Sequence, residues 1–142
     1  MSTRSAIGIL SDDGRVLGIY CHWDGYLSNN GKILQHHYNS LAKVKKLLSY
    51  GNASFIAPEI GRKHSFDLAT RHHPGWCCFY ARDRGEEDQQ AKSFDRTKEF
   101  EDHYDWSEYY YLFTDGRWIY KHSRDEIYHD LATALNELVD AA

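Results

Sequence analysis

Residues 20–26, with the sequence YCHWDGY, hold the side chains best suited to chemistry. His22 and Asp24 are two residues apart, so on an extended strand both side chains point to the same face of the sheet. A carboxylate beside an imidazole orients the ring and raises its basicity, which suits an acid–base pair or two metal ligands. The same pair also forms ordinary hydrogen bonds at strand ends. Cys21 lies on the opposite strand face from His22, so a Cys–His nucleophile is not indicated.

A second polar cluster follows in residues 80–88, YARDRGEED. Arg82 and Asp83 are expected to alternate at the end of a strand, and Arg84 begins a turn. Guanidinium groups bind carboxylates and phosphates through paired hydrogen bonds, although they also form weak surface ion pairs. The two polar segments would converge if their strand ends are neighbours. The candidate binding residues are Tyr20, His22, Trp23, Asp24, Tyr26, His64, Arg82, Asp83 and Arg84.

Complete catalytic or cofactor motifs are missing from the sequence. It has no nucleophile-elbow pattern, no P-loop and no dinucleotide-binding glycine pattern. The histidines at 36–37, 64 and 72–73 lack the tight spacings of metal sites, and neighbouring histidines on a helix point about 100° apart. We therefore expect no catalytic residues, no cofactor and no metal.

Composition limits the class of partner. The chain has 142 residues, a net charge of −4 and no Lys/Arg run longer than two, so general nucleic-acid binding is not expected. Aromatic residues make up 15%, which is more than one small core can bury and favours some rings at a partner-facing surface. Three cysteines, no apolar N-terminal leader and no long apolar run indicate a cytoplasmic protein with reduced thiols and no membrane association.

Two hairpins are the clearest local predictions. β-prone runs flank Asp13-Gly14 and Asp115-Gly116, and such dipeptides suit tight turns. Residues 32–49 predict two short helices, or one helix bent near Asn39-Ser40, with the second part capped by Ser40 and ended by Gly51. Residues 96–106, RTKEFEDHYDW, predict a helical turn.

Two further segments complete the prediction. Residues 52–75 lack a sustained period, which is typical of a functional loop. Near the C-terminus, Ser123 and Glu126 predict a capping box ahead of a closing helix. Its buried stripe is expected to consist of Ile127, Leu131, Ala134, Leu135 and Leu138. The whole chain, residues 1–142, is thus predicted to form one α+β domain, with a mainly antiparallel sheet built from hairpins and helices packed on one face.

The chain also resembles a family of small uncharacterised proteins from phages and prophage-bearing bacteria. The resemblance lies in GIYCHWDGY (residues 18–26), GKILQHHY (31–38), PEIG with HSF, and YARDRGE (80–86). Leu27 departs from the proline expected after DGY, which affects only the loop conformation. The family implies no catalytic residue. It implies a context, because small accessory phage proteins commonly bind and redirect a host protein, including components of antiviral defence.

The leading hypothesis is a non-enzymatic phage-type accessory protein of the host cytoplasm that binds and modulates a host macromolecule. Tyr and Trp favour this because they anchor interfaces with large contact areas. The alternatives are a small hydrolase, with His22 as base oriented by Asp24, an arginine holding an anion and His64 entering from the loop, and a sponge that sequesters a nucleotide. The sequence indicates neither the oligomeric state nor the partner's identity.

Overall fold

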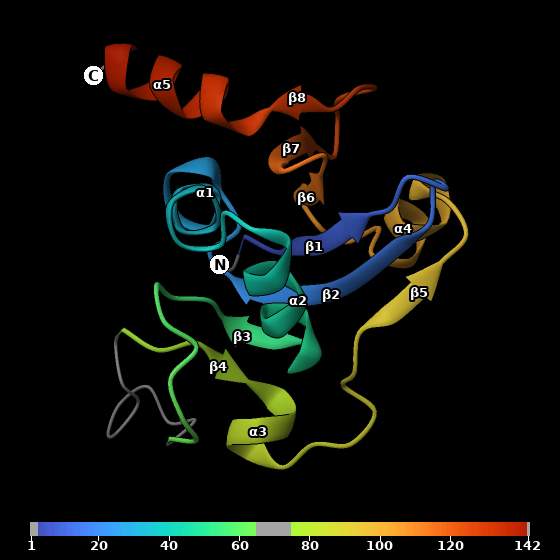
Figure 1. The fold of residues 1–142 in the computed structure, drawn as a ribbon, viewed down its shortest axis with the longest axis vertical. Coiled ribbons are helices and arrows are strands. Elements are labelled where there is room, and N and C mark those ends of the chain that lie inside the picture. The colour runs from blue at the N-terminus through green and yellow to red at the C-terminus, as the bar shows by residue number, and fades with distance from the viewer. Residues whose placement is uncertain (1–2, 65–74, 142) are drawn as a thin grey trace.

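The computed structural model describes residues 3–64 and 75–141, which form one α+β domain around a mixed sheet (Figure 1). The described strands are β1 (Ser5–Leu10), β2 (Val16–Trp23), β3 (Ala53–Phe55), β4 (Cys78–Phe79), β5 (Lys92–Phe94), β6 (Tyr109–Thr114), β7 (Arg117–His122) and β8 (His129–Asp130). The helices are α1 (Lys32–His37), α2 (Leu41–Ser49), α3 (Tyr80–Arg84), α4 (Thr97–His103) and α5 (Leu131–Ala141), with a π-helical turn, η1 (Leu27–Gly31).

Both predicted hairpins are confirmed. β1 and β2 pair around Asp13-Gly14, and β6 and β7 pair around Asp115-Gly116. Gly14 and Gly116 have φ values of 89° and 74°, which glycine adopts without the strain that a side chain would bring. A parallel pairing of β1 with β6 joins the hairpins into the sheet order β4-β3-β2-β1-β6-β7-β8, while β5 pairs with β2 off this path.

The main core lies on the sheet face that α1, α2 and α5 cover. Ile7, Ile19 and Tyr111 project from β1, β2 and β6, and each is fully buried. Leu34 of α1 and Leu48 of α2 belong to the same cluster and are also fully buried. The strands contribute alternate residues to this face, as the period of two requires.

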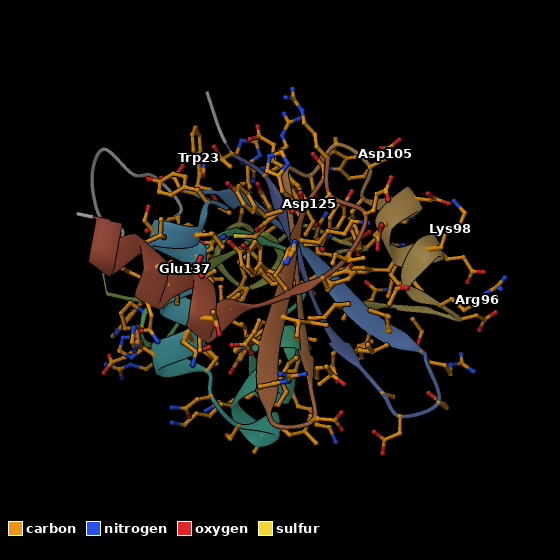
Figure 2. All side chains as sticks on the ribbon, turned by 90° about the horizontal axis from the view of Figure 1, so that it is seen from above. Trp23, Arg96, Lys98, Asp105, Asp125 and Glu137 are labelled. Carbon is orange, nitrogen blue, oxygen red and sulfur yellow. The ribbon has the colours of Figure 1, made fainter. Side chains whose placement is uncertain are left out.

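Helices cover both faces of the sheet, which corrects the prediction of helices on one face. α4 lies on the side opposite α5 (Figure 2). Its Phe100 is fully buried in a second cluster with Val16 and Leu112. The close approach needs Gly18 of β2, since an added Cβ there would lie 2.5 Å from Cε1 of Phe100. The helical turn predicted within residues 96–106 is confirmed as α4, but its polar sequence did not indicate this face.

Of the two predicted helix N-caps, the one at Ser40 is confirmed and the one at Ser123 is wrong. Ser40 caps α2, accepting a hydrogen bond from the amide of Lys43 at 3.3 Å, and Gly51 follows the helix with φ of 80°. α5, in contrast, does not begin after Ser123. Residues 129–130 first pair with β7 as β8, and Asp130 then accepts the amide of Thr133 at 3.0 Å as the actual cap.

Only part of the apolar stripe predicted for the closing helix is buried. Leu131 and Leu135 are buried as predicted, whereas Ile127 is 65% exposed and Leu138 is 41% exposed. Ile127 precedes the helix and does not belong to its stripe.

The strand predicted to carry Arg82 and Asp83 is much shorter than expected. β4 ends at Phe79, and residues 80–84 form α3, which closes on Gly85 with φ of 75°. Arg82 and Asp83 therefore lie in a helical turn and do not alternate along a strand, which corrects the prediction.

The segment 52–75, predicted to be an irregular loop, contains one short strand, β3, at 53–55. Residues 56–64 are largely without regular structure. Residues 65–74, with His72 and His73, lie outside the described part of the chain.

Candidate functional site

β2 places its polar residues as the alternation predicted. Cys21 and Ile19 are fully buried on one face, and Tyr20 and His22 are half-buried on the other. Tyr20 lies beside the second core cluster, on the α4 side of the sheet.

A continuous row of rings extends from these two residues. Trp106 packs edge-on against Tyr20 with ring centroids 5.9 Å apart, and Tyr20 lies 6.0 Å from His22. His22 in turn contacts Trp23 at 4.9 Å. We call Tyr20, His22, Trp23 and Trp106 the β2 aromatic surface. Trp23 and Asp105, the neighbour of Trp106, project at the same margin of the molecule in Figure 2.

Trp106 was missed by the sequence analysis. It is the most exposed member of the surface at 46%, and it follows α4 in a run of charged residues, EDHYDWSE. A lone tryptophan among charged residues is the one signal that could have singled it out, because such a residue has few apolar neighbours in sequence to bury it.

A short hydrogen bond ties Tyr20 to His22. The Tyr20 hydroxyl lies 2.6 Å from Nδ1 of His22. Burial, and secondarily Arg4, lowers the pKa of His22, while burial raises the pKa of Tyr20 to about 12 against the opposing influence of Arg4. At neutral pH the phenol therefore keeps its proton and the imidazole is neutral. The hydrogen bond joins two uncharged groups and fixes the orientation of the His22 ring.

Asp24 and Tyr26 belong to the turn that follows β2. The backbone carbonyl of Asp24 accepts the amide of Asn30 at 3.2 Å and Nδ2 of Asn29 at 3.0 Å, which fixes the start of η1. Tyr26 is 40% exposed, and its carbonyl accepts the Asn29 amide at 3.0 Å. Among the contacts of the described residues, none joins the Asp24 carboxylate to the His22 ring, whose partner is Tyr20.

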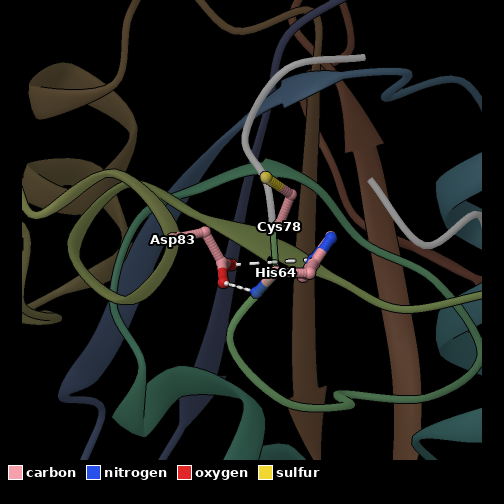
Figure 3. A group of neighbouring side chains, drawn as sticks. All are labelled: His64, Cys78 and Asp83. Carbon is pink, nitrogen blue, oxygen red and sulfur yellow. Dashed lines mark hydrogen bonds and ion pairs between the residues drawn. The ribbon is translucent and has the colours of Figure 1, made fainter. Parts of the chain in front are cut away.

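The second predicted segment forms an internal structure instead of an open site. The Asp83 side chain is fully buried and accepts the amide of Phe79 at 2.8 Å and that of His64 at 3.1 Å. Nε of Arg82 donates to its Oδ1 at 3.0 Å. Nε2 of His64 lies 2.8 Å from the carbonyl of Cys77 and 3.8 Å from Oδ2 of Asp83 (Figure 3).

Arg82 completes this arrangement. Its guanidinium donates to the carbonyls of Ile60, Gly61 and Cys77 at 2.9, 3.2 and 2.8 Å. It also lies over the Phe79 ring, with Cζ 4.9 Å from the centroid. We call His64, Arg82 and Asp83 the Asp83 lock, because they hold the loop around residues 60–64 against β4 and α3.

The β2 aromatic surface and the strand that leads into the lock are separated across the sheet by β3. Ala53 of β3 pairs with both Cys21 of β2 and Phe79 of β4, so β4 ends level with Cys21 but two strands away from it. No contact of the described residues joins His22 or Asp24 to Arg82 or Asp83. The nine predicted residues thus divide into two groups.

His64, Cys78 and Asp83 are the described residues that could hold a metal, since their ligand atoms lie within 4.8 Å of one another. Zinc accepts these ligand types. However, the Asp83 oxygens already accept three N–H groups, and one of those comes from the positively charged Arg82. Burial, and next Asp83, raises the pKa of Cys78 to about 12, so the thiol is protonated. The arrangement favours the lock over a metal centre.

The remaining candidates offer little for catalysis. Arg84 forms an exposed ion pair with Glu86 and lies over the Tyr80 ring at 5.3 Å. Cys21 and Cys77 are buried and free, and burial raises the pKa of both thiols, that of Cys21 to about 12. Protonated, buried thiols are poor nucleophiles.

Comparisons with protein-family models, curated proteins and solved structures found no match for this chain. Within the described residues, every helix is too short or too polar to cross a bilayer. The phage-type resemblance stays a prediction.

Proposed function

We propose that the protein acts by binding a macromolecule through the β2 aromatic surface and that it is not an enzyme. In the phage context that the resemblance implies, the partner is a host protein in the cytoplasm, with components of antiviral defence as candidates. The observation that carries the proposal is the row of rings that runs from the exposed Trp106 through the half-buried Tyr20 and His22 to Trp23.

The chemistry of the row suits an interface. Rings that pack against one another lose little freedom on binding, so their apolar area contributes efficiently. Trp106 is 46% exposed, and covering that part of an indole stabilises a complex by about 2–3 kcal/mol.

The hydrolase alternative loses its proposed partners in this geometry. It required His22 as a base oriented by Asp24, Arg82 or Arg84 to hold an anion, and His64 entering from the loop. Nδ1 of His22 is instead hydrogen-bonded to Tyr20, and His64 and Arg82 contact Asp83 and backbone carbonyls. One observation keeps the nucleotide sponge as a second candidate: Arg4 is close enough to the row to influence the pKa of both Tyr20 and His22. A nucleotide needs a cation beside aromatic rings on which its base can stack.

Affinity capture from host lysate tests the proposal. The tagged protein is compared with a His22→Ala/Trp106→Ala variant and with Leu41→Ala, a matched loss of exposed apolar area (45% exposed) on the opposite sheet face. Native mass spectrometry of each eluate reports proteins and small ligands together. A protein captured by the wild type and by Leu41→Ala, but not by the double variant, is expected. Equal capture by all three would contradict the proposal, and an unchanged nucleotide without a protein would favour the sponge.

A further inference from the structure

A basic hollow lies on the other side of the molecule, between the end of α1, α2 and the loop 58–61. Its volume is about 480 Å³, and its lining includes His36, His37, Lys43 and Lys46, with Glu59 as the one acidic side chain. All five side chains are exposed. Lys43 and Lys46 are three residues apart on α2, so they lie on the same helix face. α1 and α2 cover the face opposite α4, which separates this hollow from the β2 aromatic surface.

Charge is distributed unevenly around this hollow. Residues 31–63 contain six Lys or Arg residues and a single acidic residue, which gives a net charge of +5 in a chain whose total is −4. The remainder of the chain therefore carries −9. Two of the six cations, Lys43 and Lys46, line the hollow, so an anionic partner is attracted to it more than to the net-negative remainder of the chain.

The wall of the hollow is fixed in place. Arg82 binds the carbonyls of Ile60 and Gly61, and the carbonyl of Glu59 accepts the amide of Cys77 at 2.9 Å. The hydroxyl of Tyr38 donates to the carbonyl of Ala57 at 2.8 Å. The Asp83 lock thereby positions one side of the hollow before any partner arrives, which reduces the entropy lost on binding.

We infer that this basic hollow binds an acidic segment of a protein partner. Exposed ammonium groups around a shallow depression suit carboxylates presented along an extended chain, and Pro58 and Ile60 in the wall supply apolar contact for the side-chain stems. A long phosphate backbone fits less well, because it would extend beyond the hollow over a chain whose remainder carries a net charge of −9.

Fluorescence anisotropy with a labelled peptide of alternating Glu and Ser tests this inference at low ionic strength. The wild type is expected to bind the peptide, and added salt is expected to weaken binding. Lys43→Glu/Lys46→Glu is expected to weaken binding by about tenfold or more, because each reversal turns attraction into repulsion within a screening length. Lys45→Glu is the matched control, since Lys45 lines a different hollow with Leu41 and Asn39. Its effect is expected to be at least about threefold smaller than that of the Lys43/Lys46 reversal, because it changes the general charge of α2 without removing a side chain from the hollow.

Three results would overturn the inference: no salt-sensitive binding of the peptide, equal binding by the Lys43/Lys46 and Lys45 variants, or tighter binding of an oligothymidylate of the same length. Self-association in sedimentation that the Lys43/Lys46 variant loses would make a second copy the occupant and would also overturn it. Thermal melts confirm that each variant is folded. Trp106→Ala is expected to leave peptide binding intact, which separates this inference from the proposed function.

Discussion

Replacing Asp83 with Asn would measure how strongly the Asp83 lock stabilises the protein. The substitution keeps the size of the side chain but removes its charge and turns one acceptor into a donor. Two backbone amides, of Phe79 and His64, and Nε of Arg82 point at the carboxylate. The new NH₂ group must therefore face at least one N–H group, and the buried Arg82 guanidinium loses its counter-ion.

The expected loss follows from this geometry. Removing one partner of a buried ion pair costs about 3–5 kcal/mol. Three carbonyls still accept from Arg82, and 13% of its side chain is exposed, so the low end of that range applies. A free energy of unfolding reduced by about 3 kcal/mol corresponds to a Tm lower by about 10 °C in a domain of this size.

Urea unfolding followed by tryptophan fluorescence and circular dichroism measures the change, and the slope of the free energy against urea should stay the same. Glu86→Gln is the control, because it makes the same chemical change in an exposed pair with Arg84. Exposed pairs contribute little, so this control should lie within about 0.5 kcal/mol of the wild type. If Asp83→Asn is as stable as Glu86→Gln, the interpretation of the cluster as a lock is wrong.

Three further predictions concern the sheet, the row of rings and the cysteine beside the lock. Gly18→Ala should destabilise the fold by about 1–3 kcal/mol, since the new methyl group meets Phe100 at 2.5 Å; equilibrium unfolding measures this, and Phe100→Leu should restore part of the loss. Burial lowers the pKa of His22 in the folded protein, so the unfolded chain binds a proton at this residue more tightly than the folded protein does. The free energy of unfolding should therefore fall as the pH decreases through and below the ordinary histidine range. His22→Gln should flatten that part of the stability curve against pH, and an unchanged curve would contradict the environment described for the ring. Adding Zn²⁺ or a chelator should leave the Tm unchanged, whereas stabilisation by Zn²⁺ that Cys78→Ser abolishes would establish a metal centre.

The elements that depend on neighbouring residues were predictable. The two Asp-Gly turns, the alternation of β2 and the capping of α2 by Ser40 are local, so sequence alone indicated them. The face that α4 covers was not predictable, because it depends on Phe100 packing against Gly18, 82 positions earlier in the sequence. α5 begins late because residues 129–130 pair with β7, and this tertiary pairing overrides the capping-box pattern at Ser123.

In the candidate site, too, the residues placed by their neighbours in sequence were predictable and those placed by distant contacts were not. The common face of Tyr20 and His22 follows from the strand period, and the structure places them there. The burial of Asp83 was not predictable, since two of its donors come from residues 64 and 79 and the sequence pattern indicated an exposed strand end. Trp106 joined the surface only when the fold placed the segment after α4 beside Tyr20.

The most direct test of the proposed function is the affinity of the captured partner for Trp106→Ala relative to Leu41→Ala. Trp106 is the exposed end of the row of rings, and Leu41 is equally exposed on the opposite face of the sheet. Binding through the β2 aromatic surface predicts a Kd at least about thirtyfold weaker for Trp106→Ala, which corresponds to about 2 kcal/mol, and an unchanged Kd for Leu41→Ala. An unchanged Kd for Trp106→Ala would show that the partner binds elsewhere and would contradict the proposal.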